Sequence, residues 1–162
     1  MFMVDYQTYV ETYGGNVVDE TDFPRVSMRS GVILDRMTYG HVVEEDGTYG
    51  QEIRGEFLPF NEAELNYLTF AFCSLCDVVE QLDEAKANAL AGGGGTDGNA
   101  NVRTRTSGDE SITYESKRTA YDDALTDENA KDKLYKDAVF EVCDPWCFRW
   151  NPFYVGLERR WN

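Results

Sequence analysis

The sequence is poor in histidine, in positive charge and in long apolar runs. His41 is the only histidine, and no Gly-x-Ser-x-Gly, Cys–His or HExxH pattern accompanies it, so we expect no catalysis by a histidine. No apolar run approaches the roughly 18 residues that span a bilayer. Met1–Val4 leads straight into Asp5 without a basic start, so we expect no signal peptide. These absences predict a non-enzymatic protein that needs no cofactor and no membrane and folds in a reducing cytoplasm.

Positive charge is outnumbered two to one, with 15 Lys and Arg against 30 Asp and Glu, which gives a net charge of −15. Such a surface repels nucleic acid and anionic membranes, which argues against classical DNA binding. An acidic surface would suit the wall of a channel through which DNA passes without being bound. The simpler alternative is that the acidic residues keep the protein soluble. Hydrophobic residues at 42% and aromatic residues at 14% still provide enough apolar surface for one folded domain of 162 residues.

Three helices are expected in the first half of the chain, from the spacing of apolar residues. They cover Asp5–Tyr13, Asp22–Tyr39 and a long stretch from Asn61 to Leu90. The third gives the clearest signal, because Asn61 and Glu64 have the spacing of a capping box. About 30 residues at roughly 1.5 Å each predict a rod of about 45 Å that forms the spine of the fold. Gly31 indicates close approach of a neighbouring helix, and the polar segment His41–Phe57 is expected to be a loop.

The second half is expected to hold an arm, a broken helix and a tail. Gly92 to about Gly108 has almost nothing to bury, and Ser111–Tyr114 alternates polar and apolar residues, which predicts a short strand or hairpin. A helical region follows over Ala120–Val142, broken near Thr126. The predicted fold class is therefore mainly α: a small helical bundle with one long central helix, a short β arm or hairpin and an extended C-terminal tail. We expect one domain over 1–162, with a helical core at 5–90, a flexible loop or arm at 92–116, a helical region at 120–143 and a docking tail at 144–162.

The four cysteines raise the question of a metal or redox site. Cys73 and Cys76 have the CxxC spacing of zinc and thiol-redox sites, and Cys143 and Cys147 could supply two more ligands. The first pair, however, falls in the middle of a helix among apolar residues, where burial makes a thiol inert. We therefore expect the cysteines to pack in the structure without a metal, and keep a zinc or thiol-redox protein as an alternative.

Charge is distributed unevenly along the chain. From His41 to Leu90 eleven acidic residues face two basic ones, whereas the end of the chain carries Arg149, Arg159 and Arg160 against Glu158. An acidic body and a basic, aromatic tail suit contacts between copies or with a partner, because Arg and aromatic residues are typical interface anchors. The alternative is that the tail packs on its own domain.

Five segments follow one another in a recognisable order. They are Tyr6–Gly15, Val32–Gly40, the cysteine-bearing third helix, Thr106–Tyr114 and Tyr154–Arg160. In order and spacing they resemble the connector (adaptor or head-completion) proteins of long-tailed double-stranded DNA bacteriophages. The resemblance covers most of the chain, although Arg159 stands where that family often has an aromatic residue and Gly92–Asn101 is unusually rich in glycine.

This resemblance implies a helical bundle that forms a twelve-fold ring beneath the portal, at the head–tail junction of a virion assembled in the host cytoplasm. The implied partners are other copies of the chain, the portal protein, a stopper or tail-completion protein, and passing double-stranded DNA that is not bound specifically. Candidate contacts to a neighbouring copy or the portal are Tyr6, Tyr9, Tyr13, Arg103, Arg105, Ile112, Tyr114, Trp146, Arg149, Trp150, Tyr154, Leu157, Arg159, Arg160 and Trp161. The net charge of −15 leaves one alternative of another class, an acidic DNA-mimic inhibitor of a nucleic-acid enzyme.

Overall fold

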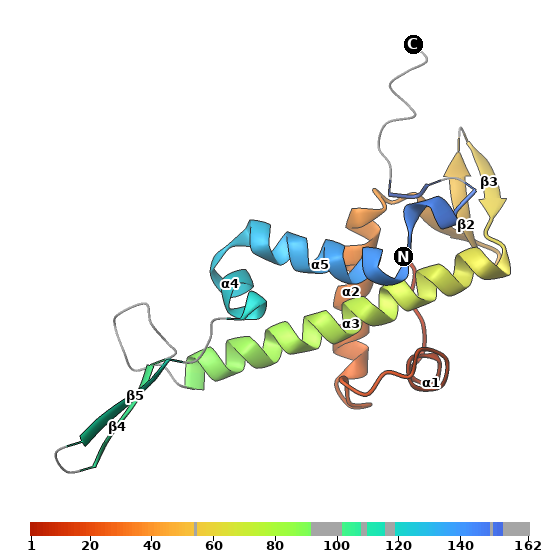
Figure 1. Cartoon of the computed structure of the whole chain (residues 1–162). Helices are drawn as coiled ribbons and strands as arrows, with labels where there is room; N and C mark the ends of the chain where they lie inside the picture. The colour runs from red at the N-terminus through yellow and green to blue at the C-terminus, as the bar shows by residue number, and fades with distance from the viewer. Residues whose placement is uncertain (54, 92–101, 108–109, 116–118, 150, 154–162) are drawn as a thin grey trace. The chain divides into compact units, whose positions relative to one another are not determined.

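The computed structural model describes residues 1–53, 55–91, 102–107, 110–115, 119–149 and 151–153. The fold is mainly α-helical, with one long helix, a small antiparallel sheet and a separate β-hairpin (Figure 1), which confirms the predicted fold class. The chain divides into two compact units, Met1–Glu80 with Tyr135–Asn162, and Gln81–Leu134. The predicted linker at 92–101 and most of the predicted extended tail lie outside the described residues, and the single-domain organisation stays a prediction.

In the first unit, the chain opens with a short helix that ends where the sequence predicted. Helix α1 (Tyr6–Thr8) continues as one turn of π-helix, η1 (Tyr9–Tyr13), and the Asp5 carboxylate caps it by accepting from the Thr8 N–H at 2.7 Å. Gly14 then adopts a left-handed φ of +78° and stops the helix. The next glycine, Gly15, lies under the Tyr9 ring, where an added Cβ would come within 2.2 Å of a ring carbon.

Helix α2 (Phe23–Met37) is amphipathic, as its sequence spacing predicted. Its buried face consists of Phe23, Val26, Ser27, Ser30, Gly31 and Leu34. Gly31 was expected to admit a neighbouring helix, and that prediction was wrong. A Cβ at Gly31 would lie 3.1 Å from the Met1 side chain and 3.2 Å from the Phe2 carbonyl, so it is the N-terminal segment that packs closely there.

The segment expected to be a loop, His41–Phe57, instead forms most of a three-stranded antiparallel sheet. Its strands are β1 (Val42–Glu45), β2 (Thr48–Ile53) and β3 (Glu56–Pro59), in the order β1-β2-β3. Asp46 and Gly47 both have positive φ, +51° and +75°, which makes the two-residue turn favoured between twisted antiparallel strands. The paired Val42 and Gln51 are buried on the inner face.

Helix α3 (Glu62–Ala91) confirms the long helix and its capping box. The Glu64 N–H donates to the Asn61 side-chain oxygen at 2.9 Å, and the Asn61 N–H donates to the Glu64 carboxylate at 2.8 Å. All six residues from Ala71 to Cys76 are buried. A helix buried on every side is covered by other elements all round, so in the first unit α3 is the central element that the sequence predicted.

The second unit contains the hairpin and a broken helix. Strands β4 (Val102–Ser107) and β5 (Glu110–Glu115) form the predicted hairpin as a two-stranded sheet of their own. The predicted break near Thr126 is confirmed, because α4 (Ala120–Thr126) and α5 (Glu128–Val142) are separated at Asp127. A Thr119–Asp122 capping box begins α4, and the Tyr121 hydroxyl donates to the Gln81 side chain of α3. A short 3-10 turn, η2 (Pro145–Cys147), follows α5 in the first unit.

The C-terminal end of α2 places a bulky residue where glycine is normally found. The Gly40 N–H donates to the Asp35 carbonyl at 2.9 Å and the Tyr39 N–H to the Arg36 carbonyl at 3.3 Å, the two bonds of a Schellman motif. The left-handed position of that motif is filled by Tyr39 (φ +53°), one residue before Gly40. Tyr39 is 56% exposed, so its ring adds little to the core while its backbone is strained.

We expect Tyr39→Gly to raise the free energy of unfolding by about 1 kcal/mol, because glycine adopts a positive φ without the steric cost that a side chain has there. Urea unfolding followed by circular dichroism measures the change. Tyr39→Ala is the matched control: it removes the same ring but keeps a Cβ, so it should give no comparable gain. Equal stabilisation by both variants would contradict the strain at this position.

Candidate interaction surfaces

The tyrosines of the N-terminal segment, expected to dock on another polypeptide, pack against their own chain. Tyr9 is fully buried, and its hydroxyl donates to the Asp77 carboxylate of α3 at 2.5 Å while accepting from the Val17 and Val18 N–H groups at 3.1 Å. Tyr13 donates to the other oxygen of Asp77 at 3.0 Å. Tyr6, partly exposed, lies with its ring 5.3 Å from that of Phe23. Tyr9 is therefore a core residue of this chain and is not available to a partner.

Asp77 is a carboxylate held in an apolar part of the helix. Burial raises the pKa of its carboxyl above the ordinary value, and the two tyrosine hydroxyls that donate to it offset only part of that effect. Burial, together with the Asp77 charge, also raises the pKa of both the Tyr9 and Tyr13 hydroxyls, which therefore stay protonated donors at neutral pH. This arrangement fastens the N-terminal segment to α3.

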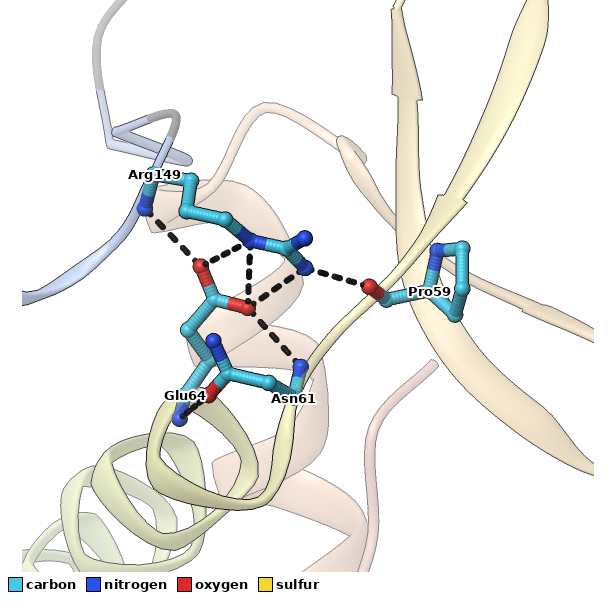
Figure 2. A network of polar contacts seen from close by, with 4 residues as sticks. All are labelled: Pro59, Asn61, Glu64 and Arg149. Atoms are coloured by element: carbon cyan, nitrogen blue, oxygen red, sulfur yellow. Dashed lines mark hydrogen bonds and ion pairs between the residues drawn. The ribbon is translucent and has the colours of Figure 1, made fainter.

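A second carboxylate, Glu64 in the first turn of α3, holds the C-terminal segment (Figure 2). Its side chain is 3% exposed and accepts from the Arg149 backbone N–H at 2.8 Å, from Arg149 Nε at 3.1 Å and from Arg149 Nη2 at 2.9 Å. Arg149 Nη2 also donates to the Pro59 carbonyl at 2.6 Å. One side chain thus joins the C-terminal segment, the end of β3 and the start of α3.

The pKa of the Glu64 carboxyl is governed by two opposing effects. Burial alone would raise that pKa, but hydrogen bonds from the Arg149 side chain and backbone and from the Asn61 N–H outweigh burial and lower it below the ordinary value. Arg149 was expected to contact a partner. The structure places its guanidinium in an ion pair within the chain while 57% of the side chain stays exposed, so a contact with a partner stays a prediction.

On either side of Arg149 the described chain packs through aromatic rings. Phe148 is buried, with its ring centroid 5.9 Å from that of Phe60, and Phe153 lies 5.4 Å from Phe140. Phe148 and Phe153 thus anchor this part of the chain to its own unit. Trp146, in contrast, is 90% exposed and remains a candidate anchor for a partner.

The remaining expected contacts fall on the hairpin or outside the described residues. The register of β4 and β5 pairs Arg103 with Tyr114 and Arg105 with Ile112. The candidates Trp150, Tyr154, Leu157, Arg159, Arg160 and Trp161 all lie outside the described residues. Their role in docking stays a prediction.

The sequence reading missed the outer face of α2. The side chains of Arg25, Met28, Arg29, Val32 and Arg36 are exposed and, at about 100° per residue, lie within about 100° of one another around the helix. Met28 is 59% exposed and Val32 49%. The signal was present, because these positions follow the same 3.6-residue period as the buried face. We call these five residues the arginine stripe.

The second missed surface is the outer face of the sheet. Its register places Glu45, Glu52, Val43 and Phe57 on the side opposite the buried Val42 and Gln51. Phe57 covers Gly50, where an added Cβ would lie 2.5 Å from its ring. Glu45 and Glu52 are exposed and Val43 and Phe57 half-buried. We call Val43, Glu45, Glu52 and Phe57 the acidic sheet face.

The cysteines lie where burial suppresses thiol chemistry. Cys73, Cys76 and Cys143 are buried thiols, and burial raises the pKa of Cys76 to about 12 and that of Cys73 still higher. The Cys147 side chain is not among those described. Across the described residues, no cluster of three or more His, Cys, Asp or Glu is placed to bind a metal ion. In the same part of the chain, no helix combines the length and apolarity of a membrane span.

Comparison of the chain with protein-family models, with curated proteins and with solved structures finds no significant match. The resemblance to phage connectors therefore rests on the order of the sequence segments alone.

Glu64 and Asp77 of α3 should make opposite contributions to the pH dependence of the free energy of unfolding. The lowered pKa of Glu64 means that its contribution is present above its unfolded-state pKa and is lost as pH falls through the folded-state value. The raised pKa of Asp77 means that its contribution is present at low pH and is lost as pH rises through the folded-state value. Relative to wild type, Glu64→Gln should therefore be most destabilising near neutral pH, whereas Asp77→Asn should become relatively more favourable as pH rises.

Urea unfolding between pH 3 and pH 7 measures both differences, and the other acidic residues cancel because all the chains share them. Glu62→Gln is the control, since Glu62 is an exposed carboxylate in the same turn as Glu64. Parallel pH trends for Glu64→Gln and Asp77→Asn would refute the assignment.

Cys76 should resist alkylation in the folded protein. With a pKa of about 12, only roughly one thiol in 10,000 is ionised at pH 8, and the thiolate is the reactive form. Iodoacetamide labelling followed by peptide mass spectrometry should find Cys73, Cys76 and Cys143 protected, and all three modified once the chain is unfolded in urea. Rapid labelling of Cys76 in the folded state would contradict this prediction and support the alternative of a thiol-redox protein.

Proposed function

We propose that this chain is a structural subunit of the head–tail junction of a double-stranded DNA bacteriophage. Copies assemble into a ring that docks on the portal, extends the DNA channel and offers a platform to a stopper or tail-completion protein. The subunit acts through its surfaces, without catalysis or a cofactor. The resemblance of five ordered segments to the connector family supports this function.

The hairpin is the observation that carries the proposal. Strands β4 and β5 pair only with each other among the described strands. Their twelve residues include few apolar ones, Val102, Ile112 and Tyr114. A lone two-stranded hairpin is marginally stable in water, and its outer edges can accept another strand. An arm of this kind fits a subunit whose hairpin is completed by a neighbouring copy.

The charge of the chain supports the same function. A net charge of −15 gives the wall of a channel that repels the phosphate backbone, so DNA passes without being retained. Trp146 supports the docking platform, because a tryptophan left 90% exposed fits the aromatic anchor of an interface.

Two variants of the full chain test this function against the portal protein of the same virus. Replacing residues 102–115 by a Gly-Ser linker of equal length should abolish the ring while leaving helical circular dichroism intact, because the hairpin contributes no helix. Trp146→Ala should keep the ring and weaken portal binding by at least about 10-fold. Light scattering measures the ring, and co-sedimentation measures portal binding.

Leu90→Ala is the control for Trp146→Ala, since Leu90 is also an exposed apolar side chain, 73% accessible, but lies outside the proposed contacts. It should leave both ring and portal binding unchanged. A wild-type chain that binds no portal at any concentration would refute the connector proposal.

The acidity of the chain favours a second candidate, a DNA-mimic inhibitor of a nucleic-acid enzyme. Its supporting observation is the net charge of −15. Such a protein would bind a basic cleft as a monomer or dimer, whereas a connector forms a larger ring. The size of the purified chain with and without the portal protein distinguishes the two.

A further inference from the structure

The arginine stripe of α2 is an exposed basic and apolar surface on a strongly acidic chain. Its centre is formed by Met28 and Val32, 59% and 49% exposed, with Arg29 and Arg36 beside them. The exposed Met28 and Val32 side chains contribute little to the core of the first unit. They are instead the residue types that interfaces bury.

The acidic sheet face has the complementary composition. Val43 and Phe57 form its half-buried apolar centre, and Glu45 and Glu52 stand beside them, exposed. From Val42 to Pro59 the sequence holds five acidic residues against a single arginine, so this is one of the most acidic parts of the chain. Each surface thus offers an apolar centre with flanking charges, and the charges are of opposite sign.

From this complementarity we propose that the arginine stripe of one copy docks on the acidic sheet face of the next copy. The inference rests on the proposed ring and adds a second contact between neighbouring copies to the one that the hairpin makes. Two different patches on one chain make a heterologous contact, which is the kind that generates rings. Because two chains of net charge −15 repel each other, association needs a contact where opposite charges meet.

Two further observations define which residues take part. Arg25, at the start of the stripe, already pairs with Glu80 of α3 at 3.0 Å and with Asp22 at 3.5 Å, so it serves the fold. Arg29 and Arg36, which are exposed beside Met28 and Val32, are the residues to test. Tyr39, just beyond α2, keeps a strained backbone and a 56% exposed ring, and strain of this kind persists where a residue serves a function.

Charge reversal on the full-length chain tests the contact. Arg29→Glu with Arg36→Glu, or Glu45→Arg with Glu52→Arg, should each weaken self-association by at least about 100-fold, because like charges then meet across the interface. A chain carrying all four substitutions restores opposite charges and should assemble again. Light scattering over a concentration series gives the association constants, and circular dichroism confirms that each variant is folded.

Lys133→Glu with Lys136→Glu is the matched control for the arginine reversal, because it reverses two exposed cations on another helix and makes the same change in net charge. It should leave assembly within a few-fold of wild type. Assembly should also weaken between about 0.1 M and 1 M salt, as the screening length falls from roughly 10 Å to 3 Å. Assembly that neither reversal affects, a four-substitution chain that stays monomeric, or a wild-type chain that never self-associates would each overturn the proposed contact.

The test separates this inference from the proposed function. A chain that assembles through these two surfaces but binds no portal would keep the contact and refute the connector. Portal binding that survives both charge reversals, with rings intact, would keep the connector and refute this contact. The chain could instead bind DNA through Arg29 and Arg36, which would appear as salt-sensitive retention on DNA that reversing both charges abolishes. If that reversal left assembly unchanged, the proposed contact would be refuted.

Discussion

The fold depends on how two carboxylates of α3, Glu64 and Asp77, find hydrogen-bond partners. Glu64 caps the helix and accepts from Arg149, so a single buried charge fixes the start of α3, the end of β3 and the C-terminal segment. Asp77, four turns further on, accepts from Tyr9 and Tyr13 and fixes the N-terminal segment. Both ends of the described chain are thus fastened to one helix through polar contacts, while the apolar core around Ala71–Cys76 supplies the burial that makes those contacts strong.

The side chains of the first unit differ in whether they contact their own chain or stay exposed to solvent. Tyr9 and Arg149, which by residue type are natural interface anchors, are used inside the chain. The exposed side chains include Trp146, the arginine stripe, and Glu45 and Glu52 of the acidic sheet face. Ser74 of α3 donates to the Ala138 carbonyl of α5, whereas Glu80 of α3 pairs with Arg25 of α2. Ser74 and Glu80 are six residues apart, and at about 100° per residue their side chains point about 120° apart around α3. Helices α2 and α5 therefore cover different sides of the central helix.

Local signals in the sequence predicted the helices. They did not predict contacts between residues that lie far apart in the sequence. The Asn61–Glu64 capping box, the break near Thr126 and the stop at Gly14 are each decided within a few residues, and the structure has all three. The sheet was missed although Asp46-Gly47 between alternating residues is a strong hairpin signal, because the abundance of charge was taken to indicate a loop. Tyr9 pairs with Asp77, 68 residues away, and Arg149 pairs with Glu64, 85 residues away. The spacing of residues in the sequence does not indicate either pairing.

The hydroxyl of Tyr9 has a consequence for how the molecule opens. It links η1, the turn at Val17 and Val18, and α3 through one oxygen atom, and its ring leaves no room for a side chain at Gly15. These bonds cannot be given up one at a time, since withdrawing the ring breaks them together. The first eighteen residues should then come away as a single cooperative unit below the energy of global unfolding, so that amide hydrogens along this segment exchange at a common rate.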